Sequence, residues 1–177
     1  MIRLSELLDL LNKNYLYQYR TRLVGGFNEP FYRTFQKGQQ AEIQFSHDYI
    51  RSALHELSHW CVAGIERRKL DDFGYWYAAD GRNQQQQDEF FKVEIKPQTI
   101  EWAFSMVSGV DFEASVDNLQ NQVGGAKQFE QNLHKQMLQY LGDSFPKRVK
   151  EILLIIASYR GIDVPCQYIS LKLSQKI

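Results

Sequence analysis

Two histidines four residues apart, in His55-Glu56-Leu57-Ser58-His59, are the side chains best suited to metal chemistry in this sequence. On a helix, residues i and i+4 lie about 40° apart around the axis and about 6 Å apart along it, so both imidazoles leave one face. The pair can bind one divalent ion, with Glu56 as a general base acting on a metal-bound water. The competing interpretation is a helix whose histidines are surface groups or hydrogen-bonded core groups.

A catalytic ion needs a third protein ligand and an open coordination position. We expect Glu94 to be this ligand, because it stands in an apolar stretch where a buried carboxylate requires a cation or hydrogen bonds. Glu101 is the alternative, since it follows seven residues later and would share the same face of a continuous helix. His134 and His47 are further options, and His134 is also expected to be a pocket residue that contacts substrate.

Two histidines and one carboxylate serve two kinds of chemistry, which their spacing does not separate. With Zn²⁺ the set supports hydrolysis, and with Fe²⁺ it leaves positions for dioxygen and substrate, which supports oxygenation. From the residues alone we favour a zinc metallopeptidase or another metal-dependent hydrolase, with Ala41–Ser46 as a strand at the edge of the substrate cleft. A binding module with a structural metal is the third class.

The helix that carries the histidine pair is expected to run from about His47 to Glu66, with Ser46 as its N-cap. Its buried stripe passes beside both histidines and extends to Ile65. The histidines should therefore lie at the border between core and solvent, where a pocket floor would be. Pro97 is expected to interrupt or kink the next helix, because proline lacks an amide proton and disfavours helix at the preceding residue.

The remaining patterns predict an α+β fold, a mostly helical single domain over residues 1–177 with a small β-sheet. The tail beyond about residue 161 is expected to be peripheral. The other predicted helices run from Leu4 towards Tyr15 or Tyr19, from about Gln84, from Trp102 to Val107, from Lys127 to Leu141 and from Lys147 to Tyr159, and strands are expected at Ala41–Ser46 (half-buried) and Val110–Val116. Loops or breaks are expected at Gly25-Gly26, Asn28-Glu29-Pro30 and Gly124-Gly125, and an irregular stretch or a hairpin turning at Asp80-Gly81 is expected over Asp71–Asn83.

Composition excludes several classes of function. Lys and Arg total 21 and Asp and Glu total 21, so the chain lacks the positive surplus with which proteins bind nucleic acid or anionic membranes. The longest aliphatic run, Ile152 to Ala157, is far shorter than the roughly 20 residues of a spanning helix. With acidic residues early in the chain and two cysteines, Cys61 and Cys166, outside any metal-binding spacing, we expect a cytoplasmic protein with reduced thiols.

Several blocks, taken in order, resemble the bacterial elongation factor P hydroxylase family over roughly residues 20 to 145. The resemblance implies a non-haem iron enzyme that hydroxylates elongation factor P on a lysine already carrying a β-lysyl group. His55 and His59 match the family's metal histidines and Glu94 its carboxylate, while no role for Glu56 follows. The blocks are Ala53 to Gly64, Asp72-Phe73-Gly74-Tyr75-Trp76-Tyr77, Asp80-Gly81-Arg82, Val93-Glu94-Ile95-Lys96-Pro97-Gln98 and Asp117-Asn118-Leu119.

The implied reaction uses Fe²⁺ as cofactor and dioxygen as co-substrate, with the lysylated side chain of elongation factor P as the partner. That side chain is long and cationic, so we expect carboxylates at the pocket mouth and aromatic rings along its methylenes. The candidates for these contacts are Asp71, Asp72 and Asp80 and the aromatics Tyr75, Trp76 and Tyr77.

Overall fold

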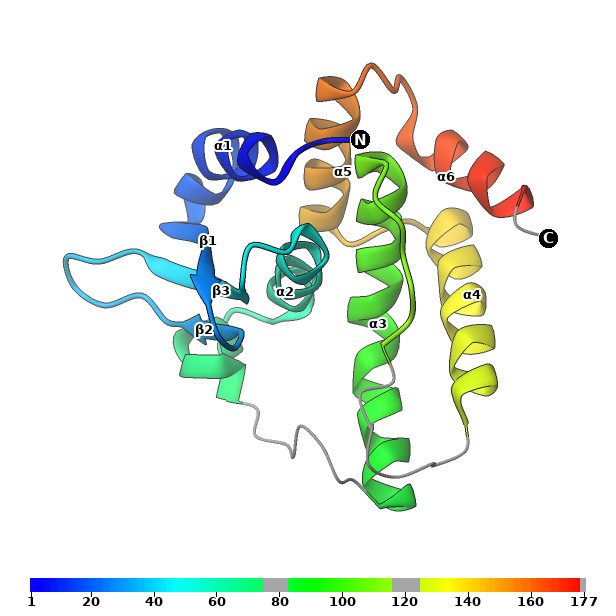
Figure 1. Ribbon diagram of the computed structural model, residues 1–177, viewed down its shortest axis with the longest axis horizontal. Coiled ribbons are helices and arrows are strands. Elements are labelled where there is room, and N and C mark those ends of the chain that lie inside the picture. Colours follow the sequence, from blue (N-terminus) through cyan, green and yellow to red (C-terminus); the bar gives the residue numbers. More distant parts are fainter. Residues whose placement is uncertain (75–82, 116–124, 176–177) are drawn as a thin grey trace.

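A computed structural model describes residues 1–74, 83–115 and 125–175 and confirms the mostly helical α+β class. A small sheet and the N-terminal helix lie on one side of the molecule, and the remaining helices gather around one long central helix (Figure 1). The described residues form helices α1 (Leu4–Asn14), α2 (Ile50–Val62), α3 (Gln84–Ser108), α4 (Ala126–Asp143), α5 (Lys147–Tyr159) and α6 (Pro165–Ser174), and strands β1 (Thr21–Phe27), β2 (Phe31–Arg33) and β3 (Ala41–Ser46).

The sheet has the order β1-β3-β2, with β3 parallel to β1 and antiparallel to β2. The bounds of β3 were predicted correctly, but the half-buried pattern was wrong, because the polar residues that alternate along this central strand are buried as well. Glu42 is only 3% exposed, since Arg22 and Arg33 from the neighbouring strands pair with its carboxylate. Arg33 Nη2 lies 2.7 Å from Glu42 Oε2.

Gly25 and Gly26 belong to β1, so the predicted loop at these residues was wrong. A Cβ on Gly25 would lie 2.5 Å from the Phe45 ring and 2.7 Å from Asp48 Oδ1. Gly26 has a φ of +87°, and the register with β3 shifts between Val24 and Phe27. The two glycines therefore allow a bulge and a close approach within a strand.

Helix α2 begins at Ile50, three residues later than predicted. His47 has a left-handed φ of 51°, Tyr49 is the N-cap, and the Ser46 hydroxyl lies 2.9 Å from Ser52 Oγ, so Ser46 is no cap. The helix also ends earlier than expected, at Val62, because Arg148 of α5 donates to the carbonyls of residues 61 and 63 at 2.8 and 2.6 Å. Beyond that end, Ile65 is 70% exposed, which corrects the predicted stripe.

Helix α3 is continuous from Gln84 to Ser108, so of the two outcomes predicted for Pro97, an interruption or a kink, the interruption was wrong. Asn83 caps it, accepting a hydrogen bond from the Gln86 amide at 2.9 Å while the Gln86 side chain accepts one from the Asn83 amide at 3.0 Å. Packing against α2, α4, α5 and α6 offsets the single hydrogen bond that proline removes. The continuity places every side chain of α3 in one helical register.

The C-terminal helices complete the core. Helices α4 and α5 closely match the predicted ranges. The predicted strand at Val110–Val116 was wrong for residues 110–115, which have no regular structure, and residue 116 lies outside the described residues. In α6, Ile169 and Leu173 are 0% and 5% exposed and belong to the hydrophobic core, a contribution that the sequence did not indicate.

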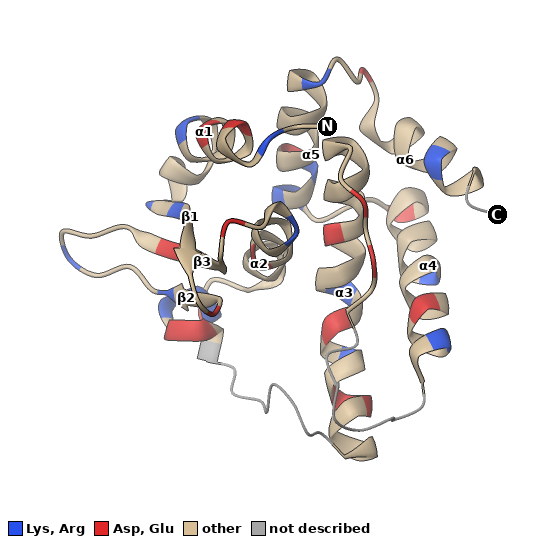
Figure 2. Cartoon of the chain, in the orientation of Figure 1, with Lys and Arg blue, Asp and Glu red and all other residues tan. Residues whose placement is uncertain are grey.

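Acidic and basic positions are interspersed along the helices and strands, consistent with zero formal net charge (Figure 2). Within the described part of the chain, no helix is long and apolar enough to cross a membrane.

Candidate metal centre

Helix α2 presents both histidines of the motif on one side, facing α3. The side chains of His55 and His59 are 23% and 17% exposed, beside the fully buried Leu54 and Leu57. Their Nε2 atoms are 3.1 Å apart. The predicted position at the border of the core is confirmed, and the rings converge as the i, i+4 spacing requires.

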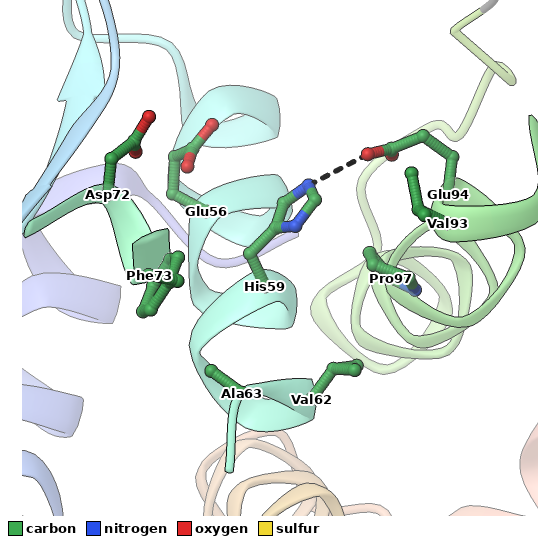
Figure 3. A pocket seen from close by; sticks show the side chains of 9 residues that line it. All are labelled: Glu56, His59, Val62, Ala63, Asp72, Phe73, Val93, Glu94 and Pro97. Carbon is green, nitrogen blue, oxygen red and sulfur yellow. Dashed lines mark ion pairs between the residues drawn. The ribbon is translucent and has the colours of Figure 1, made fainter. Parts of the chain in front are cut away.

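Glu94 of α3 lies opposite the two histidines of α2 and completes this group. Its carboxylate lies 3.3 Å from His59 Nε2 through Oε1 and 3.9 Å from His55 Nε2 through Oε2, although its side chain is only 1% exposed (Figure 3 shows the contact with His59). One ligand atom from each of the three residues lies within 4.8 Å of the others. The structure thus brings together two histidines and the carboxylate that the sequence singled out.

The donor set fits a small transition-metal ion. Two ligands about 2.1 Å from one ion and at right angles to each other are separated by about 3 Å, close to the observed spacings. Two imidazoles and one carboxylate on one side of an ion are the set used by zinc hydrolases and by non-haem iron oxygenases. The geometry alone suits both metals.

In the metal-free protein, a proton compensates Glu94. Burial raises the pKa of Glu94, but His59 and His55 outweigh it and lower the pKa to about 2. Burial lowers the pKa of His55, but the hydrogen bond and charge of Glu101, with the charges of Glu94 and Glu56, raise it to about 10. A cation, either a proton or a metal ion, is therefore favoured between these side chains.

Gln98 fixes the Glu94 carboxylate and was not identified from the sequence. Its side-chain amide donates to Glu94 Oε2 at 3.2 Å and to the Ser115 carbonyl at 2.9 Å, and its Oε1 accepts from the Ser115 amide at 2.9 Å. Gln98 is 0% exposed. The signal in the sequence was its position one helical turn after Glu94, but the contact with residue 115 depends on the tertiary fold.

Glu101 reaches the same site but does not join the three-residue group found among the described residues. Its Oε2 lies 2.8 Å from His55 Nδ1, the ring nitrogen opposite the one that faces Glu94. The alternative in which Glu101 is the third ligand is therefore not the arrangement in the structure.

A pocket opens beside His59, between α2, α3 and the 3₁₀ turn Asp71–Gly74 (Figure 3). Glu56 and Asp72 bring two carboxylates to it. Burial raises the pKa of each, and for Glu56 the neighbouring Glu94 and Asp72 raise it further against the opposing effect of the two histidines. The pocket is lined by Glu56, His59, Val62, Ala63, Asp72, Phe73, Val93, Glu94 and Pro97.

The other predicted site residues are not brought to this pocket, or lie outside the described residues. His134 of α4 contacts the Trp102 ring at a centroid distance of 6.3 Å, and the ring of His47 stacks on Tyr49 at 5.3 Å. Asp71 accepts a hydrogen bond from the Thr34 amide at 2.8 Å. The predicted contacts outside the described residues are Tyr75, Trp76, Tyr77 and Asp80.

Comparison with known proteins identifies relatives over most of the chain. The family model described as "Elongation factor P hydroxylase" matches residues 10–167. A protein from Haemophilus influenzae named "Elongation factor P lysine hydroxylase" is 39% identical over 158 residues, which are 89% of this chain and 89% of the relative. The match spans the histidine pair, Glu94 and the pocket, and the chain therefore belongs to the elongation factor P hydroxylase family.

Proposed function

We propose that this protein hydroxylates a β-lysylated lysine of elongation factor P, using Fe²⁺ held by His55, His59 and Glu94. The observation that carries the proposal is the convergence of these three side chains within 4.8 Å at the edge of a pocket, in a chain of this family. Because elongation factor P is a translation factor, we place the reaction in the cytoplasm.

Bound Fe²⁺ would supply the activation of dioxygen that oxygen insertion into a C–H bond requires. The chain's own residues supply position and exclusion of water. Gln98 holds the Glu94 carboxylate in place from a fully buried position. The core residues Leu54 and Leu57 are fully buried on α2 and exclude water from the core side of the two histidines.

The pocket suits a long cationic side chain. Val62 and Val93 present aliphatic groups from α2 and α3, and Phe73 adds an aromatic ring from the turn. Methylenes of the substrate would pack against these groups, while the Asp72 carboxylate would pair with its ammonium group. We assign Glu56 the role of an acid–base group at the pocket floor, because it lies in the pocket beside His59 and burial raises its pKa above that of an ordinary glutamate.

The proposal is tested with metal-free protein reloaded with either Fe²⁺ or Zn²⁺. With Fe²⁺ and dioxygen, lysylated elongation factor P should gain one oxygen atom by mass spectrometry, and His55→Ala, His59→Ala and Glu94→Ala should each remove that gain. Glu89→Ala is the matched control, since Glu89 is an exposed glutamate of the same helix. A zinc-dependent cleavage of unfolded casein without any oxygen gain would contradict hydroxylation and support a hydrolase.

A further inference from the structure

Glu101 is a second buried carboxylate on α3 that points at the metal centre. Its side chain is 7% exposed, and its Oε2 lies 2.8 Å from His55 Nδ1. Glu94, seven residues earlier on the same helix, approaches the opposite ring nitrogen of His55. The imidazole of His55 is thus held between two carboxylates, one at each nitrogen.

The contact with Glu101 dictates which nitrogen of His55 carries a proton. When Glu101 is ionised, its carboxylate only accepts hydrogen bonds, so His55 Nδ1 is then the donor. In the neutral ring Nε2 then carries no proton, and its lone pair is directed to the space shared with His59 Nε2, 3.1 Å away, and with Glu94. This tautomer is the one that binding through Nε2 requires.

His59 lacks an equivalent partner in the part of the chain that the structure describes. Among the described residues, the hydrogen bond and the ion pair of its ring both involve Nε2, which lies 3.1 Å from His55 Nε2 and 3.3 Å from Glu94 Oε1. Within the described ranges the two metal histidines are therefore unequal, because a buried carboxylate meets Nδ1 of His55 and none meets Nδ1 of His59. Removal of Glu101 should perturb the His55 side of the centre specifically.

From this geometry we propose that Glu101 is a positioning residue, which orients His55, fixes its Nδ1–H tautomer and so tunes the affinity of the metal centre. The inference rests on the proposed metal site, but it assigns to Glu101 a task distinct from ligation. Partners of this kind behind a metal-bound histidine contribute roughly 10- to 100-fold in metal affinity.

Titration of metal-free protein with Co²⁺ tests this role, because its visible absorption reports the coordination geometry. We expect Glu101→Leu to weaken Co²⁺ binding by roughly 100-fold and to change the absorption bands. Glu101→Gln, whose amide oxygen can still accept from Nδ1–H, should retain the fold and weaken binding by only about 10-fold. Proton–nitrogen NMR of the histidine rings should show the Nδ1–H signal of His55 in wild type and its loss in Glu101→Leu.

Glu42→Gln is the control, because it alters another buried carboxylate, located in the sheet. It should bind Co²⁺ as wild type does, and a loss equal to that of Glu101→Gln would overturn the positioning role. Wild-type affinity and spectra in both Glu101 variants would also overturn it, while leaving the metal site standing. By contrast, wild-type Co²⁺ affinity in His55→Ala and Glu94→Ala would show that the proposed metal site itself is wrong.

Discussion

Two buried carboxylates, Glu42 in the sheet and Glu94 at the pocket, have their negative charge compensated in different ways. Both are almost inaccessible to solvent, at 3% and 1% exposure. Glu42 is paired with Arg22 and Arg33, whose guanidinium groups stay charged at every physiological pH. Glu94 is paired with two imidazoles, which are cationic only when they bind a proton.

The contrast separates a structural ion pair from a site with an exchangeable cation. Burial raises the pKa of Glu42, but hydrogen bonds from Gln44 and Arg22, with the charges of both arginines, lower it below its ordinary value. Its charge balance is complete within the fold. At Glu94 a metal ion can replace the proton as the compensating cation, because imidazole nitrogens are ligands and guanidinium groups are not.

Loss of Glu94 should have the largest effect. Glu94→Ala removes a proposed ligand, so we expect more than about 100-fold weaker metal binding and a comparable loss of the oxygen gain on elongation factor P. Glu42→Gln should keep both within about twofold of wild type at a temperature where it is folded. Metal content and mass spectrometry of the product measure the two effects. Equal losses in both variants would contradict the distinction between a metal ligand at Glu94 and a structural ion pair at Glu42.

Metal binding should stabilise the protein through one of these carboxylates only. At a free metal concentration 100 times the dissociation constant, the free energy of unfolding should rise by about 2.7 kcal/mol. Urea denaturation with and without Co²⁺ measures this rise. The same rise in the free energy of unfolding is expected in Glu42→Gln, and none in Glu94→Ala. A full rise in Glu94→Ala would show that the metal ion binds at another site.

Glu42→Gln should instead lower the stability of the metal-free protein. A neutral amide cannot balance Arg22 and Arg33, so we expect the free energy of unfolding to fall by about 1–3 kcal/mol. Because the folded-state pKa of Glu42 is depressed, its contribution is present above the ordinary carboxyl pKa and is lost as pH falls. Denaturant unfolding at pH 7 and pH 3 should therefore show a smaller difference between variant and wild type at the lower pH.

The metal-free centre should also lose stability at alkaline pH. The pKa of His55 is raised to about 10, so its contribution is complete below the unfolded-state value near 6.5 and is lost as pH rises through 10. We expect the free energy of unfolding of the metal-free protein, measured by urea denaturation, to fall progressively across that window. The loss should persist in Glu42→Gln and disappear in His55→Ala; a slope unchanged in His55→Ala would refute its origin in this ring.

The sequence predicted those parts of the site that depend on local geometry. The spacing of His55 and His59 was enough to place both rings on one face, and the apolar surroundings of Glu94 indicated a carboxylate in need of a cation. The roles of Gln98 and Glu101 could not be predicted, since each depends on a partner brought close only by tertiary packing.

The errors in the fold have the same origin. Pro97 and the Gly25-Gly26 pair carry the usual local signals for a break, yet one lies inside α3 and the other inside β1. Packing against four helices offset the proline, and the nearby Phe45 ring required a residue without a side chain at position 25. Local preference was weaker than tertiary contact in both places.

Because Glu94 and Glu101 share one uninterrupted helix, the distance between them is set by residue count. Seven residues correspond to about two turns and roughly 10.5 Å of rise. The ring of His55 fits between the two side chains, so that one carboxylate approaches each of its nitrogens. Deleting one residue between them would rotate one carboxylate by about 100° relative to the other. The two carboxylates could then no longer contact His55 at the same time. The number of residues between Glu94 and Glu101 is therefore constrained by the geometry of the site.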